Sequence, residues 1–441
     1  MNMISRLFNR WFVKAAPARL VTTGFISVIL AGAFLLWLPI SQLPGVRISF
    51  LDALFESTSA VCVTGLTVVP PGDTFNLFGK IVLAILIQIG GMGVILMGMF
   101  LIMITGRKVG FKTRSLFIAA QNLSAGYTHL IDIAKTIVII TFSIEAVGAI
   151  ILGLCLLKYF DPLQAFGHAV FLAVSAFNNA GFDVFHGSAS LIPYSDNVVF
   201  CLTITFLVII GGFGFLALCD ICRNRFKWKK FSLSTKVVVF MTSLLLISGT
   251  VLFKLMTNQT WLESWFQSTI ARTAGFASYP LSLFSPGALL IFIVLMFIGA
   301  SPNSTGGGIK TTTIFALTLK AFSSSAGHDQ NSFFHRRIPE IIFTKASTVF
   351  FFGLGVVVIG TILISASQPG LTLDAILTEV VSAFATVGSS VGITSTLNTF
   401  SRWVIIFCML IGRVGTVTIA NALVVGDSKR SEYTEETILI G

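Results

Sequence analysis

Residues 377–391 read LTEVVSAFATVGSSV, an amphipathic run that reaches a pair of polar or small residues and then Gly388. Three further stretches share this pattern: ALFESTSAVCVTGLT at 53–67, AVFLAVSAFNNAGFD at 169–183 and SWFQSTIARTAGFAS at 264–278. A second landmark supports the alignment, because the glycine of an Ile-Gly pair follows each of these glycines after 24 to 30 residues. The pairs are Ile89-Gly90, Ile210-Gly211, Ile298-Gly299 and Ile411-Gly412. The chain therefore repeats one unit four times.

Composition places the chain in a membrane. Of its 441 residues 55% are hydrophobic and only 11% are charged, whereas a soluble domain has about 25% charged residues. An ordinary soluble enzyme is thereby excluded. The net charge of +11 in so apolar a chain favours orientation in a lipid bilayer over nucleic-acid binding, so we expect membrane lipid around the protein and no nucleic-acid partner.

Each unit is predicted to contain a long helix, a short half-helix and a second long helix. The short segments are too short or too polar to cross a membrane with ease; they are Phe50–Thr64, Leu163–Ala180, Trp261–Ala274 and Leu371–Val387. The long helices are placed at Val21–Pro39, Val82–Ile104, Ile131–Leu157, Val198–Ile221, Val237–Met256, Ala288–Ala316, Ile342–Ser365 and Trp403–Val425. We expect an all-α polytopic membrane protein with four tandem membrane-pore-membrane repeats around a central pore, made of eight transmembrane helices and four re-entrant pore hairpins.

The charges predict the orientation of these units. Most Lys and Arg residues lie in the leader, in three connecting segments (107–135, 223–236 and 320–345) and in the tail, all on one side of an eight-crossing arrangement. The positive-inside rule puts both termini in the cytoplasm and the hairpins outside. The predicted divisions are a cytoplasmic leader (1–20), four repeats (21–110, 111–230, 231–325 and 326–426) and a cytoplasmic tail (427–441).

The four glycine segments are candidates for an ion filter. Irregular backbone at membrane depth is tolerated where it lines water, and carbonyl oxygens that converge on one axis bind cations. Glycine permits the positive φ that aims successive carbonyls one way, and the helix carboxyl ends favour a cation. Glycines that merely let helices pack closely are the alternative, which four in register disfavour. The candidate residues, with K⁺ at their carbonyls, are Val63, Thr64, Gly65, Asn179, Ala180, Gly181, Thr273, Ala274, Gly275, Thr386, Val387 and Gly388.

A break in the third unit predicts a gate. Pro302 and three glycines cannot hold a regular helix, which leaves a flexible loop below the filter or, as the alternative, a simple kink. A phosphate-binding loop is excluded because Ile309 separates the last glycine from Lys310. The gate candidates are Gly299, Ala300, Ser301, Pro302, Asn303, Ser304, Thr305, Gly306, Gly307, Gly308, Lys310 and Arg413.

Arg413 lies within the last predicted helix, where an unpaired cation is costly. It should face a water-filled pore or a carboxylate, for which Glu145 and Asp220 are candidates. It also has room to reach across the axis, to repel a permeating cation and to anchor the loop through backbone carbonyls.

Several motifs together resemble a known family. SAFNNAGF, ARTAGF, SAFATVG, IGASPNSTGGGIKTTT and IGRVG are similar to segments of the Ktr/Trk/HKT superfamily of potassium transporters, and within it to the bacterial KtrB-type membrane subunits. The resemblance extends from about residue 20 to residue 425 and implies Gly65, Gly181, Gly275 and Gly388 as filter glycines. Ser389-Ser390 after the fourth glycine and Pro302-Asn303 in the loop depart from the family pattern.

The resemblance also implies a function and partners. It implies potassium uptake across the bacterial cytoplasmic membrane, with K⁺ as the transported ion, Na⁺ as an activator, no covalent cofactor and no enzymatic activity. It further implies a homodimer with a cytosolic, nucleotide-binding regulatory subunit, a KtrA-like ring. The alternative is a substrate-binding, sodium-coupled secondary transporter with broken helices.

Overall fold

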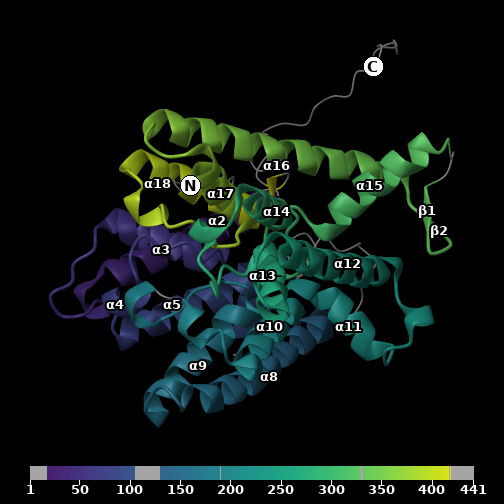
Figure 1. Ribbon diagram of the computed structural model, residues 1–441. Coiled ribbons are helices and arrows are strands. Elements are labelled where there is room, and N and C mark those ends of the chain that lie inside the picture. Colours follow the sequence, from purple (N-terminus) through teal and green to yellow (C-terminus); the bar gives the residue numbers. More distant parts are fainter. Residues whose placement is uncertain (1–16, 105–129, 189, 328–330, 417, 419–441) are drawn as a thin grey trace, which may run out of the picture.

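The computed structural model describes residues 17–104, 130–188, 190–327, 331–416 and 418. The expected tail at 427–441 and most of the expected leader lie outside the described residues. Figure 1 shows a molecule built of packed helices, with one small hairpin at its right-hand edge.

Four long helices match the predicted first helix of each unit. They are α2 (Pro17–Trp37), α8 (Leu130–Leu156), α12 (Leu233–Met256) and α16 (Glu340–Ser367). By length and composition each could cross a membrane. Their outward side chains are large and apolar: Phe351 on α16 is 69% exposed and Ile139 on α8 is 65% exposed. These surfaces suit contact with lipid, because exposing large apolar patches to water is unfavourable.

Four short helices match the predicted half-helices. They are α3 (Phe50–Cys62), α9 (Pro162–Phe177), α13 (Trp261–Thr273) and α17 (Leu373–Ala385). Capping boxes start two of them, Ser49 with Asp52 on α3 and Thr260 with Glu263 on α13. Their carboxyl ends are buried in the middle of the molecule, so each short helix ends inside the protein.

The second helix of each unit begins at a polar cap but is shorter than predicted. The helices are α5 (Leu77–Met92), α10 (Val198–Phe213), α14 (Pro286–Phe297) and α18 (Thr399–Val414). Their caps are Asn76, Asn197, Ser285 and Asn398, each accepting a backbone N–H bond from within the first turn.

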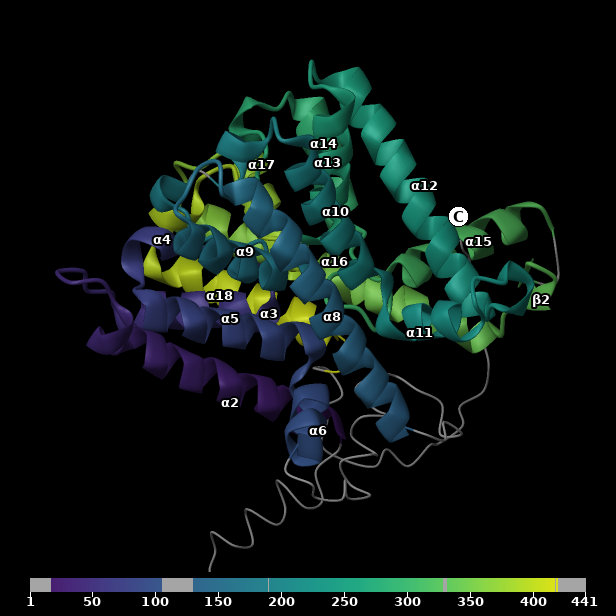
Figure 2. The same ribbon diagram turned by 90° about the horizontal axis from the view of Figure 1, so that it is seen from below.

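Three of these helices end at a glycine with positive φ. Gly93, Gly214 and Gly415 have φ of 86°, 99° and 94°, a conformation that leaves the right-handed helix and favours glycine. The predicted unbroken helices at Val82–Ile104 and Val198–Ile221 are therefore wrong. After the glycines the chain continues as α6 (Val94–Ile104) and α11 (Phe215–Arg223), and α11 is bent by 94° from α10. Figure 2 shows α6 turning away from the line of α5.

The other two second helices also differ from the predicted Ala288–Ala316 and Trp403–Val425. The third is divided by a connecting loop (residues 298–310) into α14 and α15 (Thr311–Ser325), as its proline and glycines predicted. In the fourth, Gly415 ends α18 after Val414. By length and composition four described helices, or five with the bent α10–α11 pair, could cross a membrane.

The remaining elements are short. Two strands, β1 (Ser332–Phe333) and β2 (Arg336–Arg337), form an antiparallel hairpin that amends the all-α prediction. The others are η2 (Pro39–Ser41), α4 (Pro71–Thr74), η3 (His186–Ser188), η4 (Ile192–Tyr194), η5 (Trp228–Lys230), η6 (Leu281–Leu283) and η7 (Thr394–Thr396).

The helices pack in a cyclic order. Each second helix contacts the short helix of the next unit: α5 contacts α9, α10 contacts α13, α14 contacts α17, and α18 returns to α3. At this last contact an ion pair of 2.5 Å joins Arg402 to Asp52. The first and last parts of the chain therefore lie side by side.

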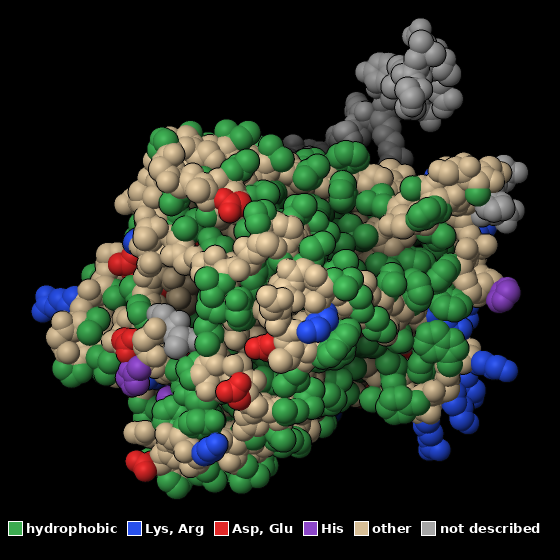
Figure 3. All heavy atoms as spheres, in the orientation of Figure 1, with side chains coloured by type: hydrophobic (Ala, Val, Ile, Leu, Met, Phe, Trp, Pro, Cys, Tyr) green, Lys and Arg blue, Asp and Glu red, His purple; other side chains and the backbone are tan. Residues whose placement is uncertain are grey.

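Charged side chains are unevenly distributed on the surface. In Figure 3, Lys and Arg side chains gather at the right-hand end below the hairpin, whereas Asp and Glu side chains lie toward the left and the front. The segment after α11 contributes the exposed basic residues Arg225, Lys227 and Lys229.

Candidate ion-conduction site

Four glycine segments (63–65, 179–181, 273–275 and 386–388) meet in one place. A β-carbon at Gly65 would collide with the carbonyl oxygen of Ala180, and one at Gly181 would lie 2.9 Å from the Cα of Gly275. From Gly275 it would lie 2.5 Å from the carbonyl carbon of Gly388, and from Gly388 it would collide with the carbonyl oxygen of Thr64. Each segment thus abuts the next and the fourth abuts the first. The structure brings all twelve residues named from the sequence into one closed ring.

The first and fourth glycine segments have the same backbone path. Val63 and Thr386 end their helices in the left-handed region, with φ of 58° and 51°, and the following glycines have φ of 94°. In both, a hydroxyl oxygen six residues earlier, from Ser59 or Ser382, accepts the glycine N–H at 3.0 Å. This hydrogen bond ties each glycine back to its own helix.

The second glycine segment follows this path in part. Asn179 is left-handed with φ of 59°, and the N–H of Ala180 donates to the carbonyl of Ser175 at 2.7 Å. Among the described residues, however, the buried Ser175 hydroxyl has no hydrogen-bond partner. The side chains of Asn179 and Thr273 share a hydrogen bond of 2.6 Å, which links the second segment to the third.

The third glycine segment takes another path. Ala274 ends its helix with φ of −141°, and Gly275 does not have the positive φ expected for all four glycines. The N–H of Gly275 instead donates to the carbonyl of Val387 at 2.5 Å, so a backbone hydrogen bond joins the third segment to the fourth. Thr269, at the position of Ser59 and Ser382, donates its hydroxyl to Trp265 within the helix.

The Ile-Gly pairs are landmarks that no local property of the sequence explains. The structure supplies the reason: a β-carbon at Gly90, Gly211 or Gly412 would collide with the last carbonyls of the neighbouring short helix, at Val61, Phe177 and Phe384 respectively. Glycine lets the second helix support the end of the short helix at backbone contact. In the third unit Gly299 faces Gly307 of the connecting loop instead.

The connecting loop contacts two of the four glycine segments. A β-carbon at Gly306 would lie 2.6 Å from the Thr273 side chain, and one at Gly307 would collide with the Thr386 hydroxyl. Lys310 donates its ammonium to the carbonyl of Gly306 at 2.7 Å. Of the gate candidates, Gly306 and Gly307 are therefore next to the third and fourth glycine segments.

Backbone hydrogen bonds join this loop to the break between α10 and α11. Backbone N–H groups of Ser301 and Thr305 donate to carbonyls of Gly212 and Gly211 at 3.1 and 3.2 Å, and the carbonyl of Asn303 accepts the N–H of Phe215 at 2.7 Å. The break between α10 and α11 frees these donors and acceptors, so the loop completes the backbone hydrogen bonds of a neighbouring broken helix.

Arg413 joins the loop to the first unit. Its guanidinium donates to the carbonyl of Thr305 and to the carbonyls of Gly90, at 2.5 Å, and Gly91, at 3.1 Å. The expected anchoring of the loop through carbonyls is thus present. The two candidate carboxylates have other partners within the described part of the chain: Glu145 accepts from Asn178 at 3.0 Å, and Asp220 accepts from Asn224, Ser232 and Thr235.

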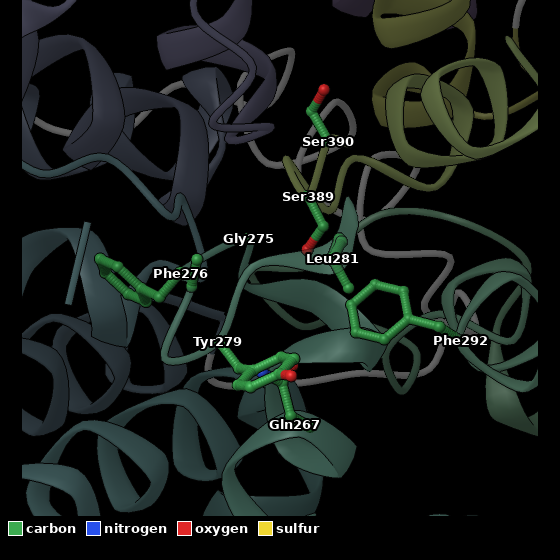
Figure 4. Close-up of a pocket in the computed structure, with 9 residues that line it drawn as sticks. Gln267, Gly275, Phe276, Tyr279, Leu281, Phe292, Ser389 and Ser390 are labelled. Carbon is green, nitrogen blue, oxygen red and sulfur yellow. The ribbon is translucent and has the colours of Figure 1, made fainter. Parts of the chain in front are cut away.

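A small pocket opens beside the ring, as Figure 4 shows. It is lined by Gly275 and by residues on either side of the third and fourth glycine segments, among them Gln267, Tyr279 and Ser389. The Ser389 hydroxyl points toward Leu281 in this pocket, and the Ser390 hydroxyl points away from it. The two serines that depart from the family pattern therefore face different surroundings.

The chain matches the family described as TrkH, a cation transport protein, over residues 15–258 and 231–432. It is 35% identical to the Ktr system potassium uptake protein B of Vibrio alginolyticus over 449 residues, covering 97% of this chain and 96% of the relative. The chain belongs to this family. The resemblance to Ktr and Trk proteins is confirmed.

Two further comparisons agree. The chain is 34% identical to the potassium/sodium uptake protein NtpJ of Enterococcus hirae, covering 97% of this chain and 98% of the relative. The crystal structure of the potassium transporter TrkH from Vibrio parahaemolyticus has the same fold, with a TM-score of 0.73 at 21% identity over 92% of this chain and 84% of that chain. Members of this family are transporters, and the chain is a transporter and not an enzyme.

Proposed function

We propose that the protein carries potassium ions into a bacterial cell across its cytoplasmic membrane, through a selectivity filter made by the four glycine segments. The closed ring of Gly65, Gly181, Gly275 and Gly388 is the observation that carries this proposal. Carbonyl oxygens around such an axis replace the hydration shell of a cation, and the four short helices direct their negative ends to it. The names of the relatives, potassium and potassium/sodium uptake proteins, support the choice of ion.

The connecting loop and Arg413 form the proposed gate. Gly306 and Gly307 of the loop lie against Thr273 and Thr386 of the ring, and the Arg413 guanidinium binds carbonyls of both the loop and Gly90. A positive charge in a passage of low dielectric constant repels a permeating cation. Flux then requires the loop and the guanidinium to move aside.

The proposed setting follows the predicted architecture. Four repeats (21–110, 111–230, 231–325 and 326–426) surround the pore, their first and second helices make eight crossings, and both termini are cytoplasmic. The protein works as a homodimer with a KtrA-like cytosolic ring, and Na⁺ activates it. The basic end of the surface in Figure 3 supports a cytoplasmic position for α11 and the hairpin.

Flux through the purified protein in liposomes tests the proposal. We expect K⁺ uptake along its gradient, faster with Na⁺ present on both sides and independent of the direction of any Na⁺ gradient. Uptake that follows the direction of the Na⁺ gradient would favour the sodium-coupled secondary transporter instead.

A pair of glycine variants tests the filter. Gly388→Ser should reduce K⁺ affinity, whereas Gly370→Ser should leave it unchanged, because no atom lies within 4 Å of a β-carbon at Gly370. Equal K⁺ uptake kinetics in the two variants would show that the ring does not line the ion path.

A further inference from the structure

Two carboxylates lie wholly buried behind the ring. Glu56 on α3 and Glu379 on α17 are both 0% exposed, and each precedes its glycine, Gly65 or Gly388, by nine residues. The corresponding residues of the other two units are Leu172 and Phe266. A buried carboxylate without hydrogen bonds is strongly disfavoured, so the partners of these two groups indicate their role.

Glu379 holds the chain that leaves the fourth glycine segment. One carboxylate oxygen accepts the hydroxyl of Ser390 at 2.7 Å, and the other accepts the hydroxyl of Thr394 at 2.5 Å. The Ser390 oxygen in turn accepts the N–H of Gly392 at 2.9 Å. The carboxylate thus ties α17 to the outgoing chain just beyond Gly388.

Glu56 does the same in the first unit with different donors. Its Oε1 accepts the backbone N–H groups of Val68 and Val69 at 2.8 and 3.2 Å. These residues follow Gly65 by three and four positions in the outgoing chain. Two carboxylates at the same position of the pattern therefore bind the outgoing chain that follows the glycine. Glu379 binds side-chain hydroxyls of that chain, and Glu56 binds its backbone N–H groups.

The third unit has a weaker tie and the second has none of this kind among the described hydrogen bonds. Gln267, one residue beyond the matched position, donates to the Ser278 hydroxyl at 3.3 Å. Leu172 has no polar atom in its side chain. The carboxylates are thus confined to the two segments with the same left-handed path and the same serine-to-glycine hydrogen bond.

We propose that Glu56 and Glu379 are positioning residues that set the preference of the pore for K⁺ over Na⁺. This inference rests on the proposed function of the ring as a filter. Neither carboxylate is exposed, so each acts through the outgoing chain and not by contact with the ion. Both oxygens of Glu379 and Oε1 of Glu56 accept hydrogen bonds from the outgoing chain, whereas Oε2 of Glu56 has no partner among the described residues. Buried hydrogen bonds of this kind make the outgoing chain rigid, and a rigid chain keeps the carbonyls of Gly65 and Gly388 at the spacing that a K⁺ ion needs.

Substitutions at Glu379 distinguish the effect of its hydrogen bonds, which tether the outgoing chain, from the effect of its negative charge. Glu379→Ala removes both hydrogen bonds and should lower the ratio of K⁺ to Na⁺ flux about tenfold. Glu379→Gln can still bond both hydroxyls, because its amide accepts from one and donates to the other. This variant should keep the ratio within about twofold of the wild type. A Gln variant as unselective as the Ala variant would show that the negative charge matters and would overturn the tether.

A second pair of variants changes the outgoing chain instead of the carboxylate. Thr394→Val keeps the shape of the side chain and removes one donor to Glu379; it should lower the ratio about threefold. Thr396→Val is the matched control on the same helix η7, since Thr396 is exposed and donates only to Ile393. These variants keep the test open if Glu379→Ala does not fold.

Both fluxes are measured in liposomes with the full chain, together with its thermal unfolding and size-exclusion profile. If the wild type shows no selective K⁺ flux, the proposed function fails and this inference with it. If the wild type is selective and both Glu379→Ala and Thr394→Val keep its ratio, the inference alone is wrong.

Discussion

The first and third glycine segments share a sequence pattern but not a backbone. Val63 is left-handed and Gly65 has φ of 94°, whereas Ala274 has φ of −141° and Gly275 is outside the left-handed region. The difference lies in what supports each segment. Gly90 of an intact helix packs on the end of α3, whereas at the end of α13 the connecting loop places Gly306 against Thr273. One local pattern therefore takes two conformations according to the neighbour beneath it.

The largest expected effect is a difference between two glycine variants. Gly388→Ser should lower K⁺ affinity more than Gly275→Ser, because only Gly388 has a φ of 94° that a side chain resists. A conformational cost of about 1–2 kcal/mol corresponds to a roughly 5- to 30-fold difference in affinity between the variants. Concentration dependence of K⁺ uptake measures it. Equal affinities would mean that packing against the next segment, which both glycines share, is the whole effect.

Arg413 tests the part of the comparison that concerns the loop. Arg413→Gln removes a cation beneath the ring and weakens the link between Thr305 and Gly90, so K⁺ flux should rise several-fold. The K⁺/Na⁺ ratio should stay nearly the same, because the glycine segments are unchanged. Flux and ratio are measured together in liposomes. A well-folded variant without flux would assign Arg413 to holding the structure together.

The serine hydroxyls sharpen the comparison further. Ser382→Ala leaves the N–H of Gly388 without its acceptor, a loss of about 1 kcal/mol, and should lower K⁺ affinity about fivefold. Ser175→Ala is the matched control, since the Ser175 hydroxyl has no partner among the described residues. Uptake kinetics of the two variants give the result, and equal effects would count against the hydroxyl tie.

The smallest effect is expected between the outer loops of the first and second units. Asp73 accepts the N–H of Gly187 at 2.9 Å and lies 2.5 Å from Nδ1 of His186, and these bonds lower the pKa of Asp73. A lowered folded pKa stabilises the fold above the unfolded pKa of about 3.9, and this stabilisation disappears as the pH falls through the folded value.

Asp73→Asn should therefore lower the melting temperature by no more than about 2 °C at pH 7, and by less at an acidic pH below the unfolded pKa of about 3.9. Asp161→Asn, directly before α9, is the control because Asp161 makes no capping hydrogen bond. Melting curves at both pH values decide it. A loss of equal size at both would contradict the electrostatic origin.

Much of the architecture could be predicted from local sequence. The apolar lengths gave α2, α8, α12 and α16, and the polar pairs before each glycine gave the ends of the short helices. The breaks at Gly93, Gly214 and Gly415 were missed, although in these three units a further glycine follows the Ile-Gly pair after three residues and could have indicated them. The pattern of apolar residues does not indicate these breaks, because a single residue with positive φ redirects a helix without changing its composition.

By itself the sequence determined the first helix and the short helix of each unit, where the four glycines lie and which residues belong together as candidates, because helix length, capping and glycine tolerance are local properties. Only the tertiary structure decided that the four glycines close a ring, that Gly275 leaves the common backbone path, that Arg413 binds carbonyls of Thr305 and Gly90, and that Glu379 holds Thr394. Those contacts join residues from different units or different limbs of a hairpin. Their formation depends on packing between segments that are far apart in the sequence, and the local sequence around each residue does not specify that packing.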